Sequence, residues 1–135
     1  MVLQMRLQNW QELFEDFCKE RRTMPFAWGV NDCALFAADC VLAIAGVDHG
    51  GKFRGYKTAR QAHRLIAMSG GLTKIVTVAL GEPLRSAYAT VGDVVLVEMN
   101  GTDSLGISNG SVCFGPGLLG MVVLNNSAVK QIWKI

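Results

Sequence analysis

The sequence has little charge of either sign. Charged residues make up 18% of its 135 positions, and thirteen basic against eleven acidic residues leave a net charge of +2. This balance does not favour a nucleic-acid partner, because such domains usually carry a strongly basic patch. There is one basic cluster, which consists of Lys19, Arg21 and Arg22. It lies at the end of a predicted helix, where we interpret it as complementing the helix dipole. The low charge density favours an apolar surface that permanent partners cover, with an ordinary tight core as the alternative.

No apolar segment is long enough to cross a bilayer. The longest, residues 34–46, contains Asp39 and falls short of the roughly 20 residues that a spanning helix needs. Residues 1–10 mix polar and apolar side chains and do not resemble a secretory signal. We therefore expect synthesis in a reducing cytoplasm, no membrane insertion and free thiols. The four cysteines are Cys18, Cys33, Cys40 and Cys113.

The sequence contains neither a Cys-x-x-Cys pair nor a cluster of cysteines and histidines. Zinc and iron–sulfur sites depend on such spacing. Cys33 and Cys40 lie seven positions apart, which places them on the same predicted helix, about two turns from each other. The spacing therefore predicts no metal site and no cofactor.

Helical patterns fill the first part of the chain, and strand patterns fill the last third. Apolar periodicity predicts helices over 10–22, 33–45, 59–69 and 72–80. Short apolar segments separated by Asn-Gly, Gly-Pro-Gly and Asn-Asn turns predict antiparallel strands over 93–98, 104–108, 112–114, 118–124 and 131–135. Helices followed by strands, with no linker between them, predict one α+β domain over residues 1–135, with N-terminal helices packed on a C-terminal antiparallel sheet.

Local signals mark the ends of the predicted helices. Asn9 stands three residues before Glu12, the spacing of a capping box, so Asn9 is expected to cap the first helix. Asn31 or Asp32 is expected to cap the second helix, and Gly46 fits its C-terminal end. The second helix is apolar on nearly every face, which predicts that it is buried centrally.

The segment PFAWGVNDC, residues 25–33, places a cysteine in the first turn of this buried helix. Backbone N–H groups and the positive end of the helix dipole stabilise a thiolate, and they can bind the oxyanion of an acyl-transfer intermediate. Cys33 is therefore a candidate nucleophile, with a small buried side chain at a helix start as the alternative. Trp28, Asn31 and Asp32 are candidate residues of the surrounding cleft, with core packing and helix capping as their alternative roles.

The stretch WGVNDC, residues 28–33, followed by an apolar helix, resembles the nucleophile motif of NlpC-type cell-wall peptidases, which have a papain-like fold. VGDVVL at 91–96 resembles a strand motif of that family, and SLGI at 104–107 falls where the family has His-Val-Gly-Ile. The likeness covers roughly residues 9–135 and is closer to small phage tail-module proteins, which share these motifs and a tryptophan near the end, here Trp133. It implies a helix that carries Cys33 and packs on an antiparallel sheet.

The chain departs from this family at the catalytic base. The family has a histidine where this chain has Ser104, and a hydroxyl cannot accept a proton from a thiol at neutral pH. His63 is predicted on a separate helix and could serve as the base if that helix folds back toward Cys33. His49 follows the helix that Cys33 begins, which places it roughly 20 Å from the sulfur. Surface positions are the alternative for both histidines.

Two main hypotheses of function follow. The first is a structural or assembly component of a phage tail tip or baseplate, an inactive peptidase homologue that binds other tail proteins and is made in the host cytoplasm. The second is an active cysteine hydrolase that uses Cys33 to cleave peptidoglycan peptides during cell-wall penetration. A third is a binding module that holds a cell-wall peptide without cleaving it. Thiol reactivity at about pH 6 distinguishes the enzyme from the others.

Overall fold

The computed structural model describes residues 5–85 and 89–135. Within these ranges the chain forms four α-helices and a six-stranded antiparallel sheet, which confirms the predicted α+β class. The helices are α1 (Trp10–Arg21), α2 (Cys33–Ala45), α3 (Ala59–Met68) and α4 (Leu72–Leu80). The strands are β1 (Leu84–Arg85), β2 (Val94–Met99), β3 (Thr102–Ser108), β4 (Cys113–Gly117), β5 (Gly120–Leu124) and β6 (Val129–Trp133). Short 3-10 helices cover Gly51–Phe53 and Asn126–Ala128.

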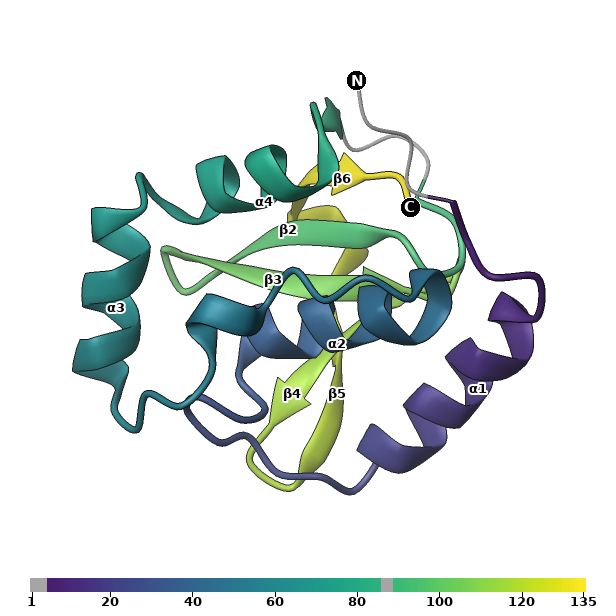
Figure 1. The fold of residues 1–135 in the computed structure, drawn as a ribbon, viewed down its shortest axis with the longest axis horizontal. Helices are drawn as coiled ribbons and strands as arrows, with labels where there is room; N and C mark the ends of the chain where they lie inside the picture. Colours follow the sequence, from purple (N-terminus) through teal and green to yellow (C-terminus); the bar gives the residue numbers. More distant parts are fainter. Residues whose placement is uncertain (1–4, 86–88) are drawn as a thin grey trace.

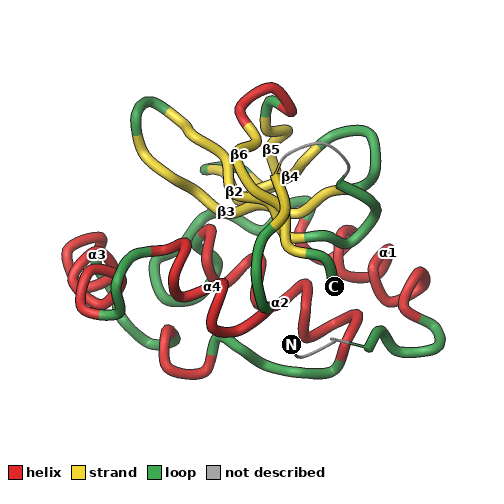
Figure 2. Tube along the Cα trace, turned by 90° about the horizontal axis from the view of Figure 1, so that it is seen from above, coloured by secondary structure: helices red, strands yellow, loops and turns green. Residues whose placement is uncertain are grey.

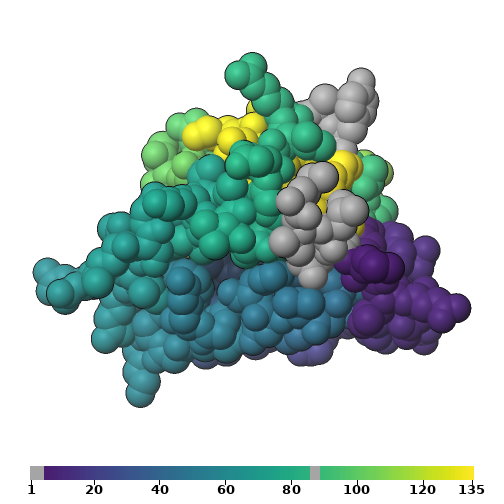
Figure 3. Space-filling view, turned by 45° about the horizontal axis from the view of Figure 1, so that its top comes forward, coloured from purple at the N-terminus to yellow at the C-terminus, as the bar shows by residue number. Residues whose placement is uncertain are grey.

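The helices and the sheet form two layers. Figure 1 shows α2 in front of the central strands, with α1 beside it and α4 along the edge of the sheet near β2 and β6. In the view from above, the four α-helices lie on one side and the strands on the other (Figure 2). The space-filling view places the teal atoms around α3 at one end of the molecule and the purple atoms of α1 at the other (Figure 3).

The strands lie side by side in the order β1-β6-β2-β3-β4-β5. β2 and β3 form a tight hairpin in which Met99 pairs with Thr102. Its turn residues Asn100 and Gly101 both have positive φ angles, 52° and 79°, which is typical of the hairpin turn that matches strand twist. β3 pairs with β4 only at its end, where Ile107 and Ser108 lie opposite Phe114 and Cys113 in the described residues. The part of β3 near residue 104 is not paired with β4 in this register. This leaves one edge of β3 beside the start of α2.

β1 was not predicted from the sequence. It has two residues, and Leu84 pairs with Ile132 of β6. A segment of this length shows no alternation of apolar and polar residues, so it carries no periodic signal. The long-range pairing with β6 is what defines it.

The helix α2 lies at the centre of the molecule, as its apolar sequence predicted. Leu35, Phe36, Cys40 and Ile44 have no exposed surface. One side of α2 packs on β2 and β3, and the other side packs on the aromatic face of α1. Because both sides are covered, the position of residue 33 at the start of α2 is determined by the core itself.

The two ends of the described chain meet at Asp93, which is fully buried. Arg6 contacts its carboxylate at 3.2 Å and also donates a hydrogen bond to the backbone carbonyl of Ile135 at 2.7 Å. Lys134 reaches the other carboxylate oxygen at 2.7 Å. The same oxygen accepts a bond from the backbone N–H of Thr90, which orders the turn that leads into β2.

The predicted cap of α1 is wrong. Asn9 stands at the N-cap position, but its side chain accepts no hydrogen bond from the first turn. Its backbone angles, φ −102° and ψ 32°, are not the extended ones that point a capping side chain at the helix. The start of α1 is held instead by the backbone, with the Leu13 N–H bonded to the Asn9 carbonyl at 3.1 Å.

Candidate functional site

Cys33 is the first residue of α2, at the place that the sequence predicted. Asp32, rather than Asn31, caps the helix: its Oδ1 accepts a hydrogen bond from the Leu35 N–H at 3.0 Å. At the other end Gly46 is left-handed, with φ 76°, and closes the helix. These two local signals set the helix bounds, so the side chain of Cys33 leaves the chain at the positive end of the helix dipole.

The thiol of Cys33 lies at the open edge of β3. The backbone N–H of Leu105, the hydroxyl of Ser104 and the backbone N–H of Ala34 each interact with the sulfur and favour its thiolate form. Burial has the larger effect and raises the pKa of Cys33, and the neighbouring Asp32 carboxylate raises it further. The expectation that the helix start lowers this pKa is therefore wrong, because the loss of water around the sulfur outweighs the three donors.

Asp32 joins Cys33 to the glycine-rich loop, residues 47–57. Its Oδ2 accepts a hydrogen bond from the Gly29 N–H at 3.0 Å and another from the hydroxyl of Tyr56. Burial raises the pKa of Tyr56 first, and the nearby Asp32 carboxylate raises it further, with a smaller contribution from Cys33. Tyr56 therefore keeps its proton at neutral pH and acts as a donor to Asp32.

The approach of Tyr56 requires a glycine at position 29. Gly29 has a φ of 76°, and a Cβ at this position would collide with the backbone carbonyl of Tyr56. The Gly55 N–H also bonds to the Gly29 carbonyl at 3.2 Å. Sequence reasoning did not find this contact, because Asp32 and Tyr56 are separated by 24 positions and share no local pattern.

Asn31 shapes the turn that presents Cys33. Its side-chain oxygen accepts a bond from Arg21 at 2.9 Å, and its nitrogen donates to the carbonyls of Met24 and Pro25 at 3.2 and 3.1 Å. The residue is 1% exposed. The side-chain amide of Asn31 thus uses its oxygen and both of its N–H donors in hydrogen bonds, and these bonds stabilise the turn that precedes Cys33.

A buried ion-pair network lies behind this turn. Arg21 of α1 contacts Asp39 of α2 at 2.6 Å, and Arg54 contacts the other oxygen of Asp39, also at 2.6 Å. Arg54 reaches Asp48 as well, at 2.9 Å. Arg21 lies in the last turn of α1, where a cation complements the helix dipole, and its side chain is also buried against Asp39 and Asn31. The network ties α1, α2 and the glycine-rich loop together.

Trp28 brings His63 into the neighbourhood of the Cys33 turn. The indole of Trp28 packs edge-on against His63 of α3, with 5.8 Å between ring centroids, and against Phe26, at 4.7 Å. Trp28 is half-buried and His63 is exposed. The described interactions of the Cys33 sulfur involve Ala34, Leu105, Ser104, Asp32 and Tyr56, and the imidazole of His63 is not one of them.

His49 lies closer to α2 than the sequence indicated. Residues 47–53 turn back along the helix, so that a Cβ at Gly50 would lie 3.0 Å from that of Ala38. His49 then lines a pocket beside Val41, instead of lying beyond the end of α2. The estimate of roughly 20 Å assumed a chain that continues along the helix axis.

Two further properties concern metals and membranes. In the parts of the chain that the structure describes, no group of three or more histidine, cysteine, aspartate or glutamate side chains could hold a metal ion. All four cysteines are free thiols. None of the helices in residues 5–85 and 89–135 is long and apolar enough to cross a membrane.

Comparison with known proteins identifies the family of the chain. A family model described as a domain of unknown function, DUF6950, matches residues 5–135, so the chain belongs to that family. No curated protein and no solved structure matches the chain.

Proposed function

We propose that this member of the DUF6950 family is a structural or assembly component of a phage tail tip or baseplate, with a papain-like, NlpC-like layout and an inactive catalytic site. The resemblance of the Cys33 and Ser104 segments to small tail-module proteins supports this proposal. The observation that carries it is the hydroxyl of Ser104 at the sulfur of Cys33.

Cysteine peptidases need a base that takes the proton from the thiol and later returns it to the leaving amine. A serine hydroxyl beside the sulfur cannot do this at neutral pH. Burial raises the pKa of Cys33, so the attacking thiolate is scarce as well. A site with a neutral thiol and no imidazole among the described contacts of its sulfur suits a structural role better than turnover.

The exposed apolar side chains of the β4–β5 hairpin support an assembly role. Leu118 and Leu119 are 85% and 93% exposed, and Val123 on the same hairpin is 65% exposed. Neighbouring apolar side chains at a hairpin tip are typical of surfaces that a partner covers. We infer that this hairpin contacts another tail protein in the assembled particle.

The alternative is an active peptidoglycan hydrolase. The packing of His63 on Trp28, five positions before Cys33, favours it, because a change in the α3 position would bring an imidazole toward the sulfur. The imidazole would then take the thiol proton as the sulfur attacks a peptide carbonyl. It would pass that proton to the leaving amine as the C–N bond breaks, and water would hydrolyse the thioester to release the acyl group.

Alkylation of the thiol separates the two functions. The intact protein is treated with iodoacetamide at about pH 6, and modification of the peptide that contains Cys33 is followed by mass spectrometry. We expect Cys33 of the folded protein to remain unmodified. The rate at which the same peptide is modified in denatured protein at the same pH is the reference. Rapid modification at about pH 6, together with peptidoglycan cleavage that Cys33→Ala abolishes, would overturn the proposal.

The variant Ser104→His tests the position of the missing base. An imidazole at residue 104 would lie beside the sulfur, and we expect it to raise the alkylation rate of Cys33 at neutral pH by about tenfold or more. The matched control is Asp103→His on the same strand, where the native side chain pairs with Lys130 at an exposed site. Equal rates in the two variants would contradict the assignment of Ser104 as the residue that occupies the base position.

A further inference from the structure

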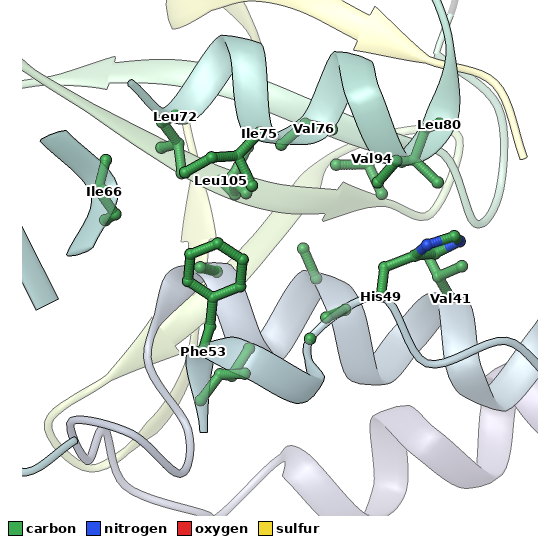
Figure 4. A pocket seen from close by; sticks show the side chains of 16 residues that line it. Val41, His49, Phe53, Ile66, Leu72, Ile75, Val76, Leu80, Val94 and Leu105 are labelled. Atoms are coloured by element: carbon green, nitrogen blue, oxygen red, sulfur yellow. The ribbon is translucent and has the colours of Figure 1, made fainter. Parts of the chain in front are cut away.

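A pocket lies between α2 and α4, on the helical side of the sheet (Figure 4). Its floor is formed by α2 and by Val94 and Leu105 of the sheet, and α4 covers it. Figure 4 labels His49 beside Val41 at one end and Ile66 and Leu72 at the other. The remaining lining residues are Ala34, Leu35, Ala37, Ala38, Gly50, Phe53, Ile75, Val76, Ala79 and Leu80.

The walls of this pocket are almost wholly hydrocarbon. Among the lining residues His49 is the one with a titratable side chain, and none carries a carboxylate, an ammonium or a guanidinium group. Burying a charged or strongly polar group against such walls would be costly. Apolar cavities of this kind also hold water poorly, because water needs two to four polar partners. The lining therefore selects an apolar ligand.

The pocket is elongated along α2. Its lining includes Ala34 near the start of the helix and Val41 seven residues later, which corresponds to about 10 Å at the rise of an α-helix. The side chains of α4 follow the same direction on the opposite wall, as Figure 4 shows. A narrow space between two helices fits an extended chain better than a compact ring system.

The covering helix α4 is less buried than α2, although its Leu72 and Leu80 pack partly buried against the core. Of its nine described residues, Val76 is the one that is buried. Gly70 and Gly71 precede the helix with φ angles of 93° and 99°, and Gly81 follows it with 95°. A Cβ at Gly71 or Gly81 would meet nothing within 4 Å, so glycine at these positions serves the backbone conformation and not close packing. The glycines at both ends of α4 are positions where a change in backbone angles would move the helix.

We propose that the pocket between α2 and α4 binds an unbranched aliphatic chain, which enters when α4 moves away from α2. The hydrocarbon lining, the elongated shape and the glycine-flanked cover carry this proposal. It does not depend on any activity of Cys33. It adds a ligand site to the structural role proposed above.

Binding is tested with linear alcohols, from butanol to decanol, followed by chemical shifts in the isotope-labelled full-length protein. Each additional methylene that enters the pocket should strengthen binding by about fourfold. The gain should stop when the chain fills the space, and the shifts should concentrate on the residues that line the pocket. Affinity that rises without limit along the series, or shifts spread over the surface, would show non-specific partitioning and overturn the proposal.

The variant Ala79→Phe fills the pocket from α4. We expect it to weaken octanol binding by at least tenfold. Ala67→Phe on α3 is the matched control, because Ala67 is exposed and does not line the pocket, and it should bind octanol as the native chain does. Thermal unfolding of both variants shows that they are folded, and Ala79→Leu provides a smaller filling residue if phenylalanine prevents folding. Equal octanol affinity in the filled and control variants would contradict the proposed site.

Hydrogen exchange tests the movement of α4. Without ligand, the amides of α4 should exchange faster than those of α2, because their opening needs no global unfolding. Octanol should slow exchange in α4 and leave α1 unchanged. Exchange in α4 as slow as in α2, and insensitive to octanol, would rule out entry beneath this helix.

Phosphatidylcholine vesicles distinguish the source of the chain. Co-sedimentation that Ala79→Phe removes would indicate that the chain is drawn from a lipid bilayer. Octanol binding without co-sedimentation would indicate a free aliphatic molecule, and both outcomes support the pocket as the binding site.

Discussion

The hydroxyl of Tyr56 donates a hydrogen bond to the same carboxylate, Asp32, that caps the helix carrying Cys33. One side chain thus fixes both the start of α2 and the end of the glycine-rich loop. Because Asp32 is 2% exposed, water does not compensate for the loss of a donor to its carboxylate.

The variant Tyr56→Phe should therefore lower the free energy of unfolding by about 1.5–3 kcal/mol, the range for a hydrogen bond to a charged group. Urea denaturation of Tyr56→Phe, Asp32→Asn and the double variant measures the coupling between the two residues. We expect the double variant to lose less than the sum of the single losses. Additive losses would mean that the two side chains act independently.

Gly29 should tolerate no side chain. Gly29→Ala combines a strained positive φ with a collision against the Tyr56 carbonyl, so we expect a loss of about 2–5 kcal/mol in the free energy of unfolding. Gly55→Ala is the matched control, since its φ is 90° but a Cβ there meets nothing within 4 Å. It should lose about 1–2 kcal/mol from backbone strain alone. Similar losses at the two positions would contradict the close approach of Tyr56.

The buried pair of Arg21 and Asp39 should matter more than any exposed pair. Arg21→Met leaves Asp39 with Arg54 as its remaining partner, so we expect a loss of about 3 kcal/mol, at the lower end for a broken buried pair. Lys130→Met, which removes the exposed contact with Asp103 at 3.0 Å, is the control. It should leave the urea midpoint unchanged within error, because solvent and salt screen exposed pairs. A greater effect of Lys130→Met would reverse this ranking.

Stability should fall at alkaline pH. Burial raises the pKa of Cys33, Cys40 and Cys113 above the ordinary value of 9.0. A thiol with a raised folded pKa holds its proton more tightly in the folded state than in the unfolded state. Its contribution to stability is therefore complete below the unfolded pKa and is lost as pH rises toward the folded pKa.

The free energy of unfolding, measured in urea, should decrease progressively above about pH 8.5, where unfolded cysteines begin to ionise. Cys40→Ala provides the comparison, because Cys40 is fully buried among apolar side chains. This variant should be less stable at neutral pH, since it leaves a cavity, but its stability should depend less on pH. If the native protein is equally stable at about pH 8 and pH 10, the thiols have the same pKa in the folded and unfolded states, which would contradict this prediction.

Most elements could be predicted from the sequence because their signals are local. The apolar pattern of residues 33–45, the Asp32 cap and the Gly46 end lie within one segment, and the predicted bounds of α2 are confirmed. The same is true of α4, whose limits at Leu72 and Leu80 follow from glycines at both ends. Asn9 shows where this approach fails, because capping also needs an extended backbone at that residue.

The environment of Cys33 could be predicted in part. The resemblance to a known motif predicted that Ser104 stands where the NlpC family has its histidine, and the structure brings the Ser104 hydroxyl to the sulfur. The direction of the pKa shift was not predictable. It depends on how much water the folded chain removes from the thiol, and only burial in three dimensions decides that.

The sequence by itself determined where the helices begin and end, which helix is buried, and that a cysteine opens it. The tertiary structure alone decided that Tyr56 meets Asp32, that Arg21 is buried against Asp39, and that α4 covers an apolar pocket beside α2. Helix periods and caps arise from residues a few positions apart, so a local pattern records them. Contacts between distant segments arise from the packing of whole elements, and no local pattern records which side chains that packing brings together.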